Sequence, residues 1–332
     1  MRPVVGVVHY SDIYDRLRNS SSRVEWRSRP TAESLVPGFY PDLDALFIEV
    51  PHERWPEFSV ELLVHLPAMR RLRWIHVAAS GVEALLVPQI VESELIVTNA
   101  AGVLDEPIAE YILAAVASLA KQLPRTIDLQ RQRAWMHRDV ALLRGARTII
   151  LGPGGIGREA GRLLSAIGMT VVGVGRSRRD EDPVFGHVHG AGELEELVRT
   201  ADYLINTIPL TPDTIDVVSA RILAACKPGL SLVSIARGET INMPSLVRSL
   251  ESGQLSAALI DGFEHEPLPK DSPYWGVPGL IVSPHMSGAI PDRPDRHVAI
   301  FTSHLDRFLI GELPNSVLDK RLGFVTRQGE SS

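Results

Sequence analysis

Three residues that could act together on an acid substrate lie in the second half of the chain: Arg237 in SIARGET, Glu266 in EHEP and His285 in SPHMSG. An arginine binds a carboxylate through two parallel hydrogen bonds, and a histidine transfers a proton near neutral pH. A glutamate beside that histidine favours the imidazolium form and holds the ring in place. Together, these residue types suit a 2-oxo or 2-hydroxy acid.

A glycine-rich loop, LGPGGIGREAG, lies upstream of these residues. Gly152, Gly154 and Gly157 stand between an apolar run at 148–151, which predicts a strand, and a helical pattern at 158–167. In a dinucleotide-binding loop the first glycine permits a tight turn, the second admits a pyrophosphate, and the third allows the helix to pack on the strand. An ordinary glycine turn is the alternative, but the strand and helix around the loop favour dinucleotide binding.

The residues after the next predicted strand, at 170–174, indicate which dinucleotide is preferred. An NAD enzyme usually carries Asp or Glu there to accept the ribose hydroxyls, whereas this chain has Arg176, Ser177 and Arg178. Guanidinium groups bind a 2′-phosphate that a carboxylate would repel. We therefore expect NADP(H) to be preferred and NAD(H) to be possible, with Arg176 as the main contact. A solvated charged turn before Asp180–Asp182 is the alternative.

Short apolar runs alternate with helical patterns along the chain, which predicts parallel sheets covered by helices on both faces. The predicted strands are 4–8, 45–48, 74–77, 96–98, 148–151, 170–174, 203–207, 231–235, 257–261 and 280–282. The predicted helices include 55–66, 106–122, 158–167 and 296–310. Arg237, Glu266 and His285 each follow a predicted strand, and ligands collect at the carboxyl ends of parallel strands.

Composition restricts the class of protein. A length of 332 residues with 45% hydrophobic content favours two domains, and a net charge of −6 leaves no basic surface for nucleic acid. The single cysteine, Cys226, excludes an internal disulfide and a cysteine metal cage. No apolar run approaches about 18 residues, and the amino terminus predicts a strand rather than a signal peptide. We expect a cytoplasmic protein with no metal, membrane or nucleic-acid partner.

The chain resembles the D-isomer-specific 2-hydroxyacid dehydrogenase family over nearly its whole length. The resemblance is carried by the pairs Arg237–Gly238, Glu266–Pro267 and Pro284–His285, and by the stretches RLRWIHVAASGVEAL, TNAAGVLDEPIAEYIL and IPLTPDT. It implies an α/β fold with two doubly wound parallel-sheet domains. A Rossmann cofactor domain, 99–290, would be inserted in a flavodoxin-like substrate domain formed by 1–98 and 291–332.

The resemblance also implies the reaction and the role of each residue. A hydride would pass between a nicotinamide and a 2-oxo or D-2-hydroxy acid, as in a glyoxylate/hydroxypyruvate reductase. His285 would be the acid or base, Glu266 its partner, and Arg237 the ligand of the substrate carboxylate. The backbone amides of Ser80 and Gly81 would also meet that carboxylate.

The implied cofactor contacts extend beyond the glycines and arginines already named, and Asp261 resembles the position that contacts the nicotinamide carboxamide. The full set is Gly152, Gly154, Gly155, Ile156, Gly157, Arg176, Ser177, Arg178, Thr207, Ile208, Pro209, Ile235, Ala236, Asp261, His285 and Gly288.

Three positions depart from the family pattern: Ser234 stands for Asn, Asn242 for Asp and Gly262 for Val. These departures affect the expected local packing rather than the reacting groups.

The family resemblance implies a homodimer, for which the helix face at 112–119 is the expected contact and a buried interdomain helix is the alternative. Trp135 is expected in a packed core, or else at an active site across a dimer interface.

Other functions remain open at this stage. A corepressor-like protein that senses nicotinamide redox state would bind cofactor without relying on turnover, but the intact Arg237, Glu266 and His285 set disfavours it. Phosphoglycerate dehydrogenase is a second alternative, disfavoured because the chain ends near residue 332 without the regulatory domain that some members carry. A formate- or phosphite-oxidising enzyme is disfavoured because formate-type members have Gln at the position of Glu266.

Overall fold

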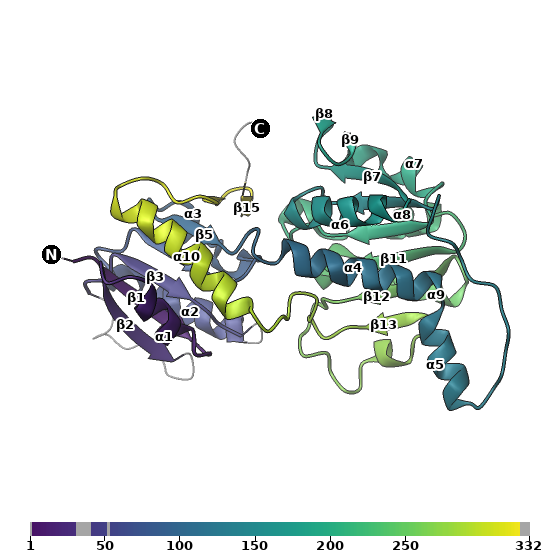
Figure 1. Ribbon diagram of the computed structural model, residues 1–332, viewed down its shortest axis with the longest axis horizontal. Helices are drawn as coiled ribbons and strands as arrows, with labels where there is room; N and C mark the ends of the chain where they lie inside the picture. Colours follow the sequence, from purple (N-terminus) through teal and green to yellow (C-terminus); the bar gives the residue numbers. More distant parts are fainter. Residues whose placement is uncertain (1, 31–40, 52–53, 326–332) are drawn as a thin grey trace. The chain divides into compact units, whose positions relative to one another are not determined.

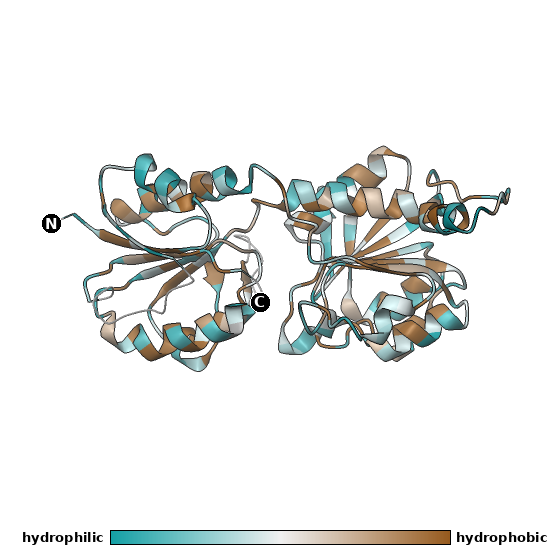
Figure 2. Cartoon of the chain, turned by 90° about the horizontal axis from the view of Figure 1, so that it is seen from below, coloured by the Kyte–Doolittle hydropathy of each residue, from teal (hydrophilic) through white to brown (hydrophobic). Residues whose placement is uncertain are grey.

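Short runs rich in valine, isoleucine and leucine form two mostly parallel β-sheets, one in each of two units (Figure 1). The computed structural model describes residues 2–30, 41–51 and 54–325. Unit 1 comprises Met1–Leu104 and Ile290–Ser332, and unit 2 comprises Asp105–Ala289, so that unit 2 interrupts unit 1 in the sequence. In each unit, helices cover both faces of an apolar sheet (Figure 2). The predicted α/β class with two doubly wound sheets is confirmed.

Unit 1 contains a five-stranded sheet in the order β2-β1-β3-β4-β5, in which all neighbouring strands are parallel. Its strands are β1 (Val4–His9), β2 (Glu25–Pro30), β3 (Ala45–Ile48), β4 (Trp74–Val77) and β5 (Ile96–Asn99). Its helices are α1 (Ile13–Ser20), α2 (Trp55–His65), α3 (Pro88–Val91) and α10 (Arg293–Leu309), and a short hairpin, β14 (Leu318–Asp319) with β15 (Phe324–Val325), follows. One face of the sheet buries Phe47, Trp74 and Phe301 of α10.

Unit 2 contains an eight-stranded sheet in the order β13-β12-β11-β10-β6-β7-β9-β8, parallel except for the β8–β9 pair. Its strands are β6 (Arg147–Leu151), β7 (Thr170–Gly175), β8 (Arg179–Asp182), β9 (Gly186–Gly190), β10 (Tyr203–Asn206), β11 (Leu230–Ser234), β12 (Leu255–Ile260) and β13 (Leu280–Val282). Its helices are α4 (Asp105–Ala120), α5 (Leu123–Arg131), α6 (Gly155–Ala166), α7 (Leu194–Val198), α8 (Ala220–Ala225) and α9 (Met243–Glu251).

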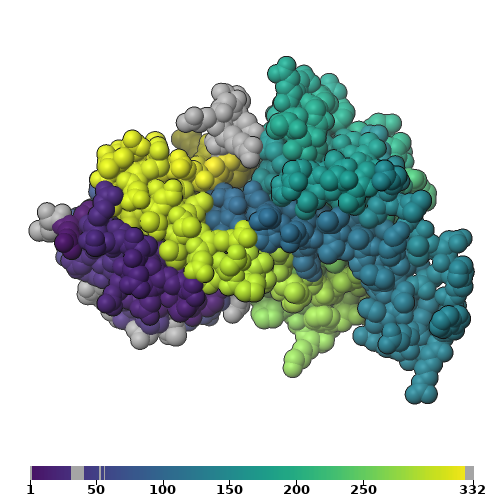
Figure 3. Space-filling view, in the orientation of Figure 1, coloured from purple at the N-terminus to yellow at the C-terminus, as the bar shows by residue number. Residues whose placement is uncertain are grey.

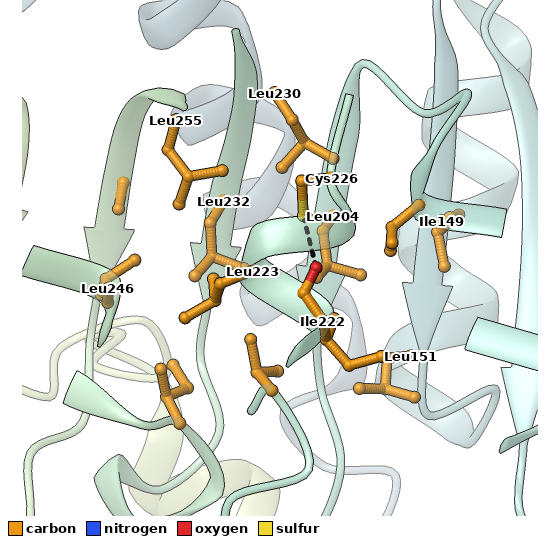
Figure 4. Packing of buried hydrophobic residues seen from close by; sticks show 14 of the residues in the cluster. Ile149, Leu151, Leu204, Ile222, Leu223, Cys226, Leu230, Leu232, Leu246 and Leu255 are labelled. Atoms are coloured by element: carbon orange, nitrogen blue, oxygen red, sulfur yellow. Dashed lines mark hydrogen bonds between the residues drawn. The ribbon is translucent and has the colours of Figure 1, made fainter. Parts of the chain in front are cut away.

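Cys226 lies in the apolar core of unit 2, where its thiol donates to the carbonyl of Ile222 (Figure 4). Burial raises the pKa of this thiol to about 12. The cysteine is therefore a packing residue with little thiolate character.

All ten predicted strands are present, but the sequence does not predict β2, β8, β9, the β14–β15 hairpin or the helices α1, α3, α5, α7, α8 and α9. Edge strands such as β2 and β8 pair on one side only, so they carry exposed polar residues rather than an apolar run. Asp180–Asp182, which follow the charged turn at 176–178, belong to β8, and Asp182 is buried.

The apolar stripe of α4 is buried within unit 2. Ile112, Val116 and Leu119 are covered by their own chain, and α4 packs along α6. These side chains are therefore not available as the expected dimer contact. Several exposed large apolar residues lie instead on α5 and the segment after it. This part of the chain extends from unit 2 (Figures 1 and 3).

Candidate active site and cofactor loop

The glycine loop of unit 2 connects β6 to α6 and is closed by close backbone contacts. Gly152 has φ +100°, in the left-handed region that favours glycine, and a Cβ there would lie 2.9 Å from Thr207 Oγ1. The Thr207 hydroxyl donates to the Gly152 carbonyl at 2.7 Å. A Cβ on Gly157 would lie 2.1 Å from the same carbonyl oxygen. The first and third glycines thus allow the turn and the helix–strand approach that the sequence predicts.

Gly154 differs from the other loop glycines because, apart from its own atoms and its chain neighbours, nothing lies within 4 Å of the position that a Cβ would take. Its backbone faces open space just before the amino terminus of α6, where helix amides favour an anion. By contrast, a Cβ on Gly155 would meet the carboxylate of Asp105 at 1.9 Å. The loop therefore fits a dinucleotide pyrophosphate at Gly154.

The turn after β7 carries the residues expected to select the cofactor. Arg176, Ser177 and Arg178 are all exposed. The Arg178 guanidinium forms a two-pronged ion pair with Glu193, with Nε–Oε1 and Nη2–Oε2 distances of 2.7 and 2.6 Å. His189 Nδ1 also lies 3.0 Å from Glu193 Oε2, and these contacts lower the pKa of Glu193 strongly, the Arg178 hydrogen bond contributing most. Glu193 therefore engages one edge of the Arg178 guanidinium.

Arg237 follows β11 and begins a short 3-10 helix, Gly238–Thr240. The Thr240 amide and hydroxyl both donate to the Arg237 carbonyl, at 3.1 and 2.6 Å. The buried Asn206 amide group of β10 donates to the hydroxyls of Ser234 and Thr240 at 3.2 and 2.9 Å. Ser234, where the family usually has Asn, is thus part of a buried network that fixes the backbone beside Arg237.

Two glycines let the ends of β11 and β12 approach each other. A Cβ on Gly238 would lie 2.4 Å from the Glu264 amide nitrogen, and one on Gly262 would lie 2.4 Å from the Ala236 carbonyl oxygen. Gly262 therefore suits a backbone approach that leaves no room for the valine that the family resemblance would place there. This close approach brings the backbone at Arg237 against the segment that leads to Glu266.

Glu266 and His285 form a hydrogen-bonded pair in the loops that follow β12 and β13. His285 Nδ1 lies 2.8 Å from Glu266 Oε2, and Glu266 Oε1 accepts from the Phe263 amide at 2.8 Å. The Glu266 side chain is 13% exposed, and the His285 side chain is 31% exposed. Glu264 is exposed, so the carboxylate beside His285 is the one before proline. A carboxylate at Nδ1 favours the Nδ1–H form of the ring.

Asp261, at the end of β12, holds the loop that carries His285. Its Oδ1 accepts from the Met286 amide at 2.9 Å and from the Ser283 hydroxyl, and its Oδ2 accepts from the Ser287 amide at 3.0 Å. His285 itself has φ +51°, a conformation that bulky residues adopt only when their surroundings enforce it. The role of this buried carboxylate in the loop is absent from the sequence predictions, which name Asp261 only as a nicotinamide contact.

Tyr111 of α4 extends the same network, since its hydroxyl lies 2.7 Å from Ser283 Oγ. Burial raises the pKa of Tyr111. Its pairing could not be predicted from sequence, because 172 residues separate the two side chains.

In unit 1, Ser80 and Gly81 follow β4 at the carboxyl end of the sheet. The Asn99 side chain donates to the Ser80 carbonyl at 2.6 Å, and the Ala100 amide donates to the Ala79 carbonyl at 3.0 Å. These bonds hold residues 99 and 100 to unit 1, whose first segment ends at Leu104.

Trp135 is fully exposed, at 101% relative accessibility, so the expectation of a packed core position is wrong.

Within residues 2–30, 41–51 and 54–325, no helix is long and apolar enough to cross a membrane. In the same described part of the chain, no group of three or more His, Cys, Asp or Glu residues is arranged to hold a metal ion.

Residues 113–287 match the family model of the D-isomer specific 2-hydroxyacid dehydrogenase NAD binding domain. The chain is 31% identical over 255 residues to the (S)-sulfolactate dehydrogenase of Chromohalobacter salexigens, covering 75% of this chain and 80% of the relative. It is 29% identical to glyoxylate/hydroxypyruvate reductase A of Serratia proteamaculans, over 76% of this chain and 82% of that one.

Among solved structures, a D-isomer specific 2-hydroxyacid dehydrogenase family protein from Aeromonas salmonicida superposes with a TM-score of 0.81. It is 28% identical, and the match covers 96% of this chain and 100% of that one. The chain therefore belongs to the D-isomer specific 2-hydroxyacid dehydrogenase family, a family of oxidoreductases that use a nicotinamide cofactor. The resemblance seen in the sequence is confirmed.

Proposed function

We propose that this protein is an NADPH-preferring reductase of 2-oxo acids, which also oxidises the corresponding D-2-hydroxy acids. The observation that supports this most strongly is the His285–Glu266 pair, with Nδ1 and Oε2 2.8 Å apart. The backbone of Arg237 lies against the segment that leads to Glu266, as the contact between Gly238 and Glu264 indicates. A proton donor and a carboxylate ligand thus emerge from adjoining strand ends.

In this proposal His285 supplies the proton. Because Nδ1 bonds to the carboxylate, Nε2 is the nitrogen that protonates the substrate oxygen during reduction and receives the proton during oxidation. Glu266 stabilises the imidazolium and is itself oriented by the Phe263 amide. A bound nicotinamide supplies or accepts the hydride.

Arg237 binds the substrate carboxylate through its guanidinium and polarises the keto oxygen. The amides of Ser80 and Gly81, which follow β4 in unit 1, are further candidate ligands for a substrate carboxylate. The loop of Gly152, Gly154 and Gly157 holds the pyrophosphate at Gly154, and Arg176 and Ser177 bind the 2′-phosphate. Arg178 is a further candidate contact, and Glu193 already engages one edge of its guanidinium.

The central experiment is a panel of acids assayed with NADPH by loss of absorbance, beside a His285→Ala variant. The panel contains glyoxylate and hydroxypyruvate, with (S)-sulfolactate and D-3-phosphoglycerate tested in the oxidative direction with NADP. We expect turnover of at least one acid and a loss of roughly 10²–10⁴-fold in kcat for His285→Ala. Absence of turnover with every acid, with cofactor binding retained, would favour a nicotinamide sensor instead.

Cofactor preference is tested by Arg176→Ala. A charge-assisted hydrogen bond contributes roughly 1.5–3 kcal/mol, so the NADPH/NADH ratio of kcat/KM should fall about tenfold or more. An unchanged ratio would show that Arg176 does not read the 2′-phosphate.

We also propose a homodimer formed through α5 and the segment that follows it. Leu123, Ile127, Trp135, Val140 and Leu142 are all exposed on this part of unit 2, with Trp135 at 101% and Leu142 at 76%. A group of exposed large apolar side chains is typical of a protein interface. Light scattering should show a dimer that Trp135→Arg weakens, and a wild-type monomer at assay concentration would exclude this assembly.

A further inference from the structure

A buried ion cluster in unit 2, formed by Asp182, Arg158 and Arg179, lies outside the groups that carry the proposed chemistry. Asp182 ends β8, and its side chain is 1% exposed. Its Oδ2 accepts from Arg158 at 2.9 and 3.2 Å and from Arg179 at 3.1 and 3.3 Å. Burial would raise the pKa of this carboxyl, but the backbone and arginine hydrogen bonds outweigh it and lower the pKa. One ionised carboxylate therefore joins two arginines from different elements.

Both arginines connect Asp182 to the glycine loop and its helix. Arg179 Nη2 donates to the Pro153 carbonyl, between Gly152 and Gly154, at 3.2 Å. Arg158 belongs to the first turns of α6, and its amide donates to the Gly154 carbonyl at 3.0 Å. A displacement of Asp182 would therefore act on the loop from two sides.

The turn between β8 and β9 is packed against the same elements. The amides of Val184 and Phe185 donate to Asp182 Oδ1 at 3.1 and 3.2 Å. A Cβ on Gly161 of α6 would lie 3.0 Å from the Phe185 ring, and one on Gly173 of β7 would lie 2.8 Å from it. These two glycines therefore leave room for the ring, and the hairpin is fixed on unit 2 by packing as well as by charge.

The turn expected to bind the 2′-phosphate, residues 176–178, is held in place at both of its ends. On one side, Gly175 ends β7 and pairs with Gly190 of β9. On the other side, Arg179 is held by Asp182 and Pro153. The turn expected to bind the 2′-phosphate and the loop expected to bind the pyrophosphate are thus tied to one carboxylate.

We propose that Asp182 is a positioning residue that fixes the glycine loop and the 2′-phosphate turn relative to each other, through Arg179 and Arg158. This inference rests on the proposed use of NADPH. Recognition of the two phosphate groups is then coupled, although Asp182 touches neither.

The test uses the full-length protein and three ligands: NADPH, ADP, which has a pyrophosphate without a 2′-phosphate, and 2′,5′-ADP, which has a 2′-phosphate without a pyrophosphate. Asp182→Asn removes the charge and preserves the side-chain size. Glu159→Gln is the matched control. Glu159 lies next to Arg158 on α6, and its carboxylate pairs with Arg162 of the same helix. Calorimetry gives the three dissociation constants, and steady-state assays separate KM from kcat.

We expect Asp182→Asn to raise the dissociation constants of ADP and 2′,5′-ADP about tenfold each, with kcat at saturating NADPH within about twofold of wild type. Arg179→Met should reproduce the loss, and Arg179→Lys should recover part of it. Glu159→Gln should leave all three constants unchanged. If Asp182→Asn does not fold, Arg179→Met decides the question by the same criteria.

The proposal is overturned if a folded Asp182→Asn binds both fragments as wild type does, or if only the 2′,5′-ADP affinity falls. Tighter binding of either fragment would also overturn it, since the cluster would then act through charge rather than position. Failure of the proposed function is a separate result, because wild type would then turn over none of the acids or would bind NADPH no more tightly than NADH.

Discussion

Replacing Glu266 with glutamine tests whether the carboxylate acts through His285. Glu266 is 13% exposed and accepts two hydrogen bonds of 2.8 Å, one from the Phe263 amide and one from His285. Glutamine keeps the size and one acceptor oxygen but removes the negative charge from the group that is hydrogen-bonded to His285. A hydrogen bond to a charged group contributes roughly 1.5–3 kcal/mol, which corresponds to a loss of about 10- to 150-fold in kcat/KM for reduction.

The assay is steady-state reduction of the best 2-oxo acid by NADPH. Glu264→Gln is the matched control, because Glu264 lies two residues away and is exposed. Since Glu266 is proposed to act through His285, Glu266→Gln should have little further effect in a His285→Ala background. The reasoning fails if kcat/KM of Glu266→Gln stays within about threefold of the Glu264→Gln control. It also fails if the double variant loses the product of the two single-variant losses of Glu266→Gln and His285→Ala.

Three other predictions concern stability and reactivity. Burial lowers the pKa values of His297 and His304 to about 4, so neutral imidazoles stabilise unit 1 above about pH 6.5 and their contribution disappears as the pH falls toward 4. This loss amounts to roughly 3 kcal/mol per histidine, measurable as a lower free energy of unfolding at pH 4 than at pH 7, and an unchanged value would contradict it. Gly262→Ala should lower the free energy of unfolding by about 1–3 kcal/mol in thermal unfolding, because the new Cβ would lie 2.4 Å from the Ala236 carbonyl oxygen. Gly192→Ala is the control and should leave stability unchanged, since a Cβ there would meet no neighbouring group within 4 Å. The buried thiol of Cys226, with a pKa of about 12, should resist alkylation in the native protein and react after unfolding, and rapid native labelling would show that the core opens.

The central strands are predictable because a strand that is buried on both faces has a continuous run of apolar residues. β3 and β4 coincide with the apolar runs at 45–48 and 74–77, and each is completely buried. β2 and β8 are not predictable in this way. Their residues face solvent or form ion pairs, so pairing with a neighbouring strand, rather than an apolar pattern, makes them strands.

The candidate site shows the same division. Pro267 and Pro284 beside Glu266 and His285 support a family resemblance without any knowledge of the fold. The fold supplies contacts over long separations, such as the bonds from the loop at Met286 and Ser287 to Asp261. These depend on which strands become neighbours in the sheet, and residue type alone does not determine that.

The sequence by itself determined the chemical groups and their order, because a glycine loop, an arginine, a glutamate and a histidine after successive strands suit few reactions. Only the tertiary structure decided that Asp182 is buried and forms ion pairs with two arginines, and that Trp135 is exposed. The physical reason is that burial and pairing are properties of the surroundings. The same aspartate in an open turn would be solvated, and the same tryptophan in a core would be covered.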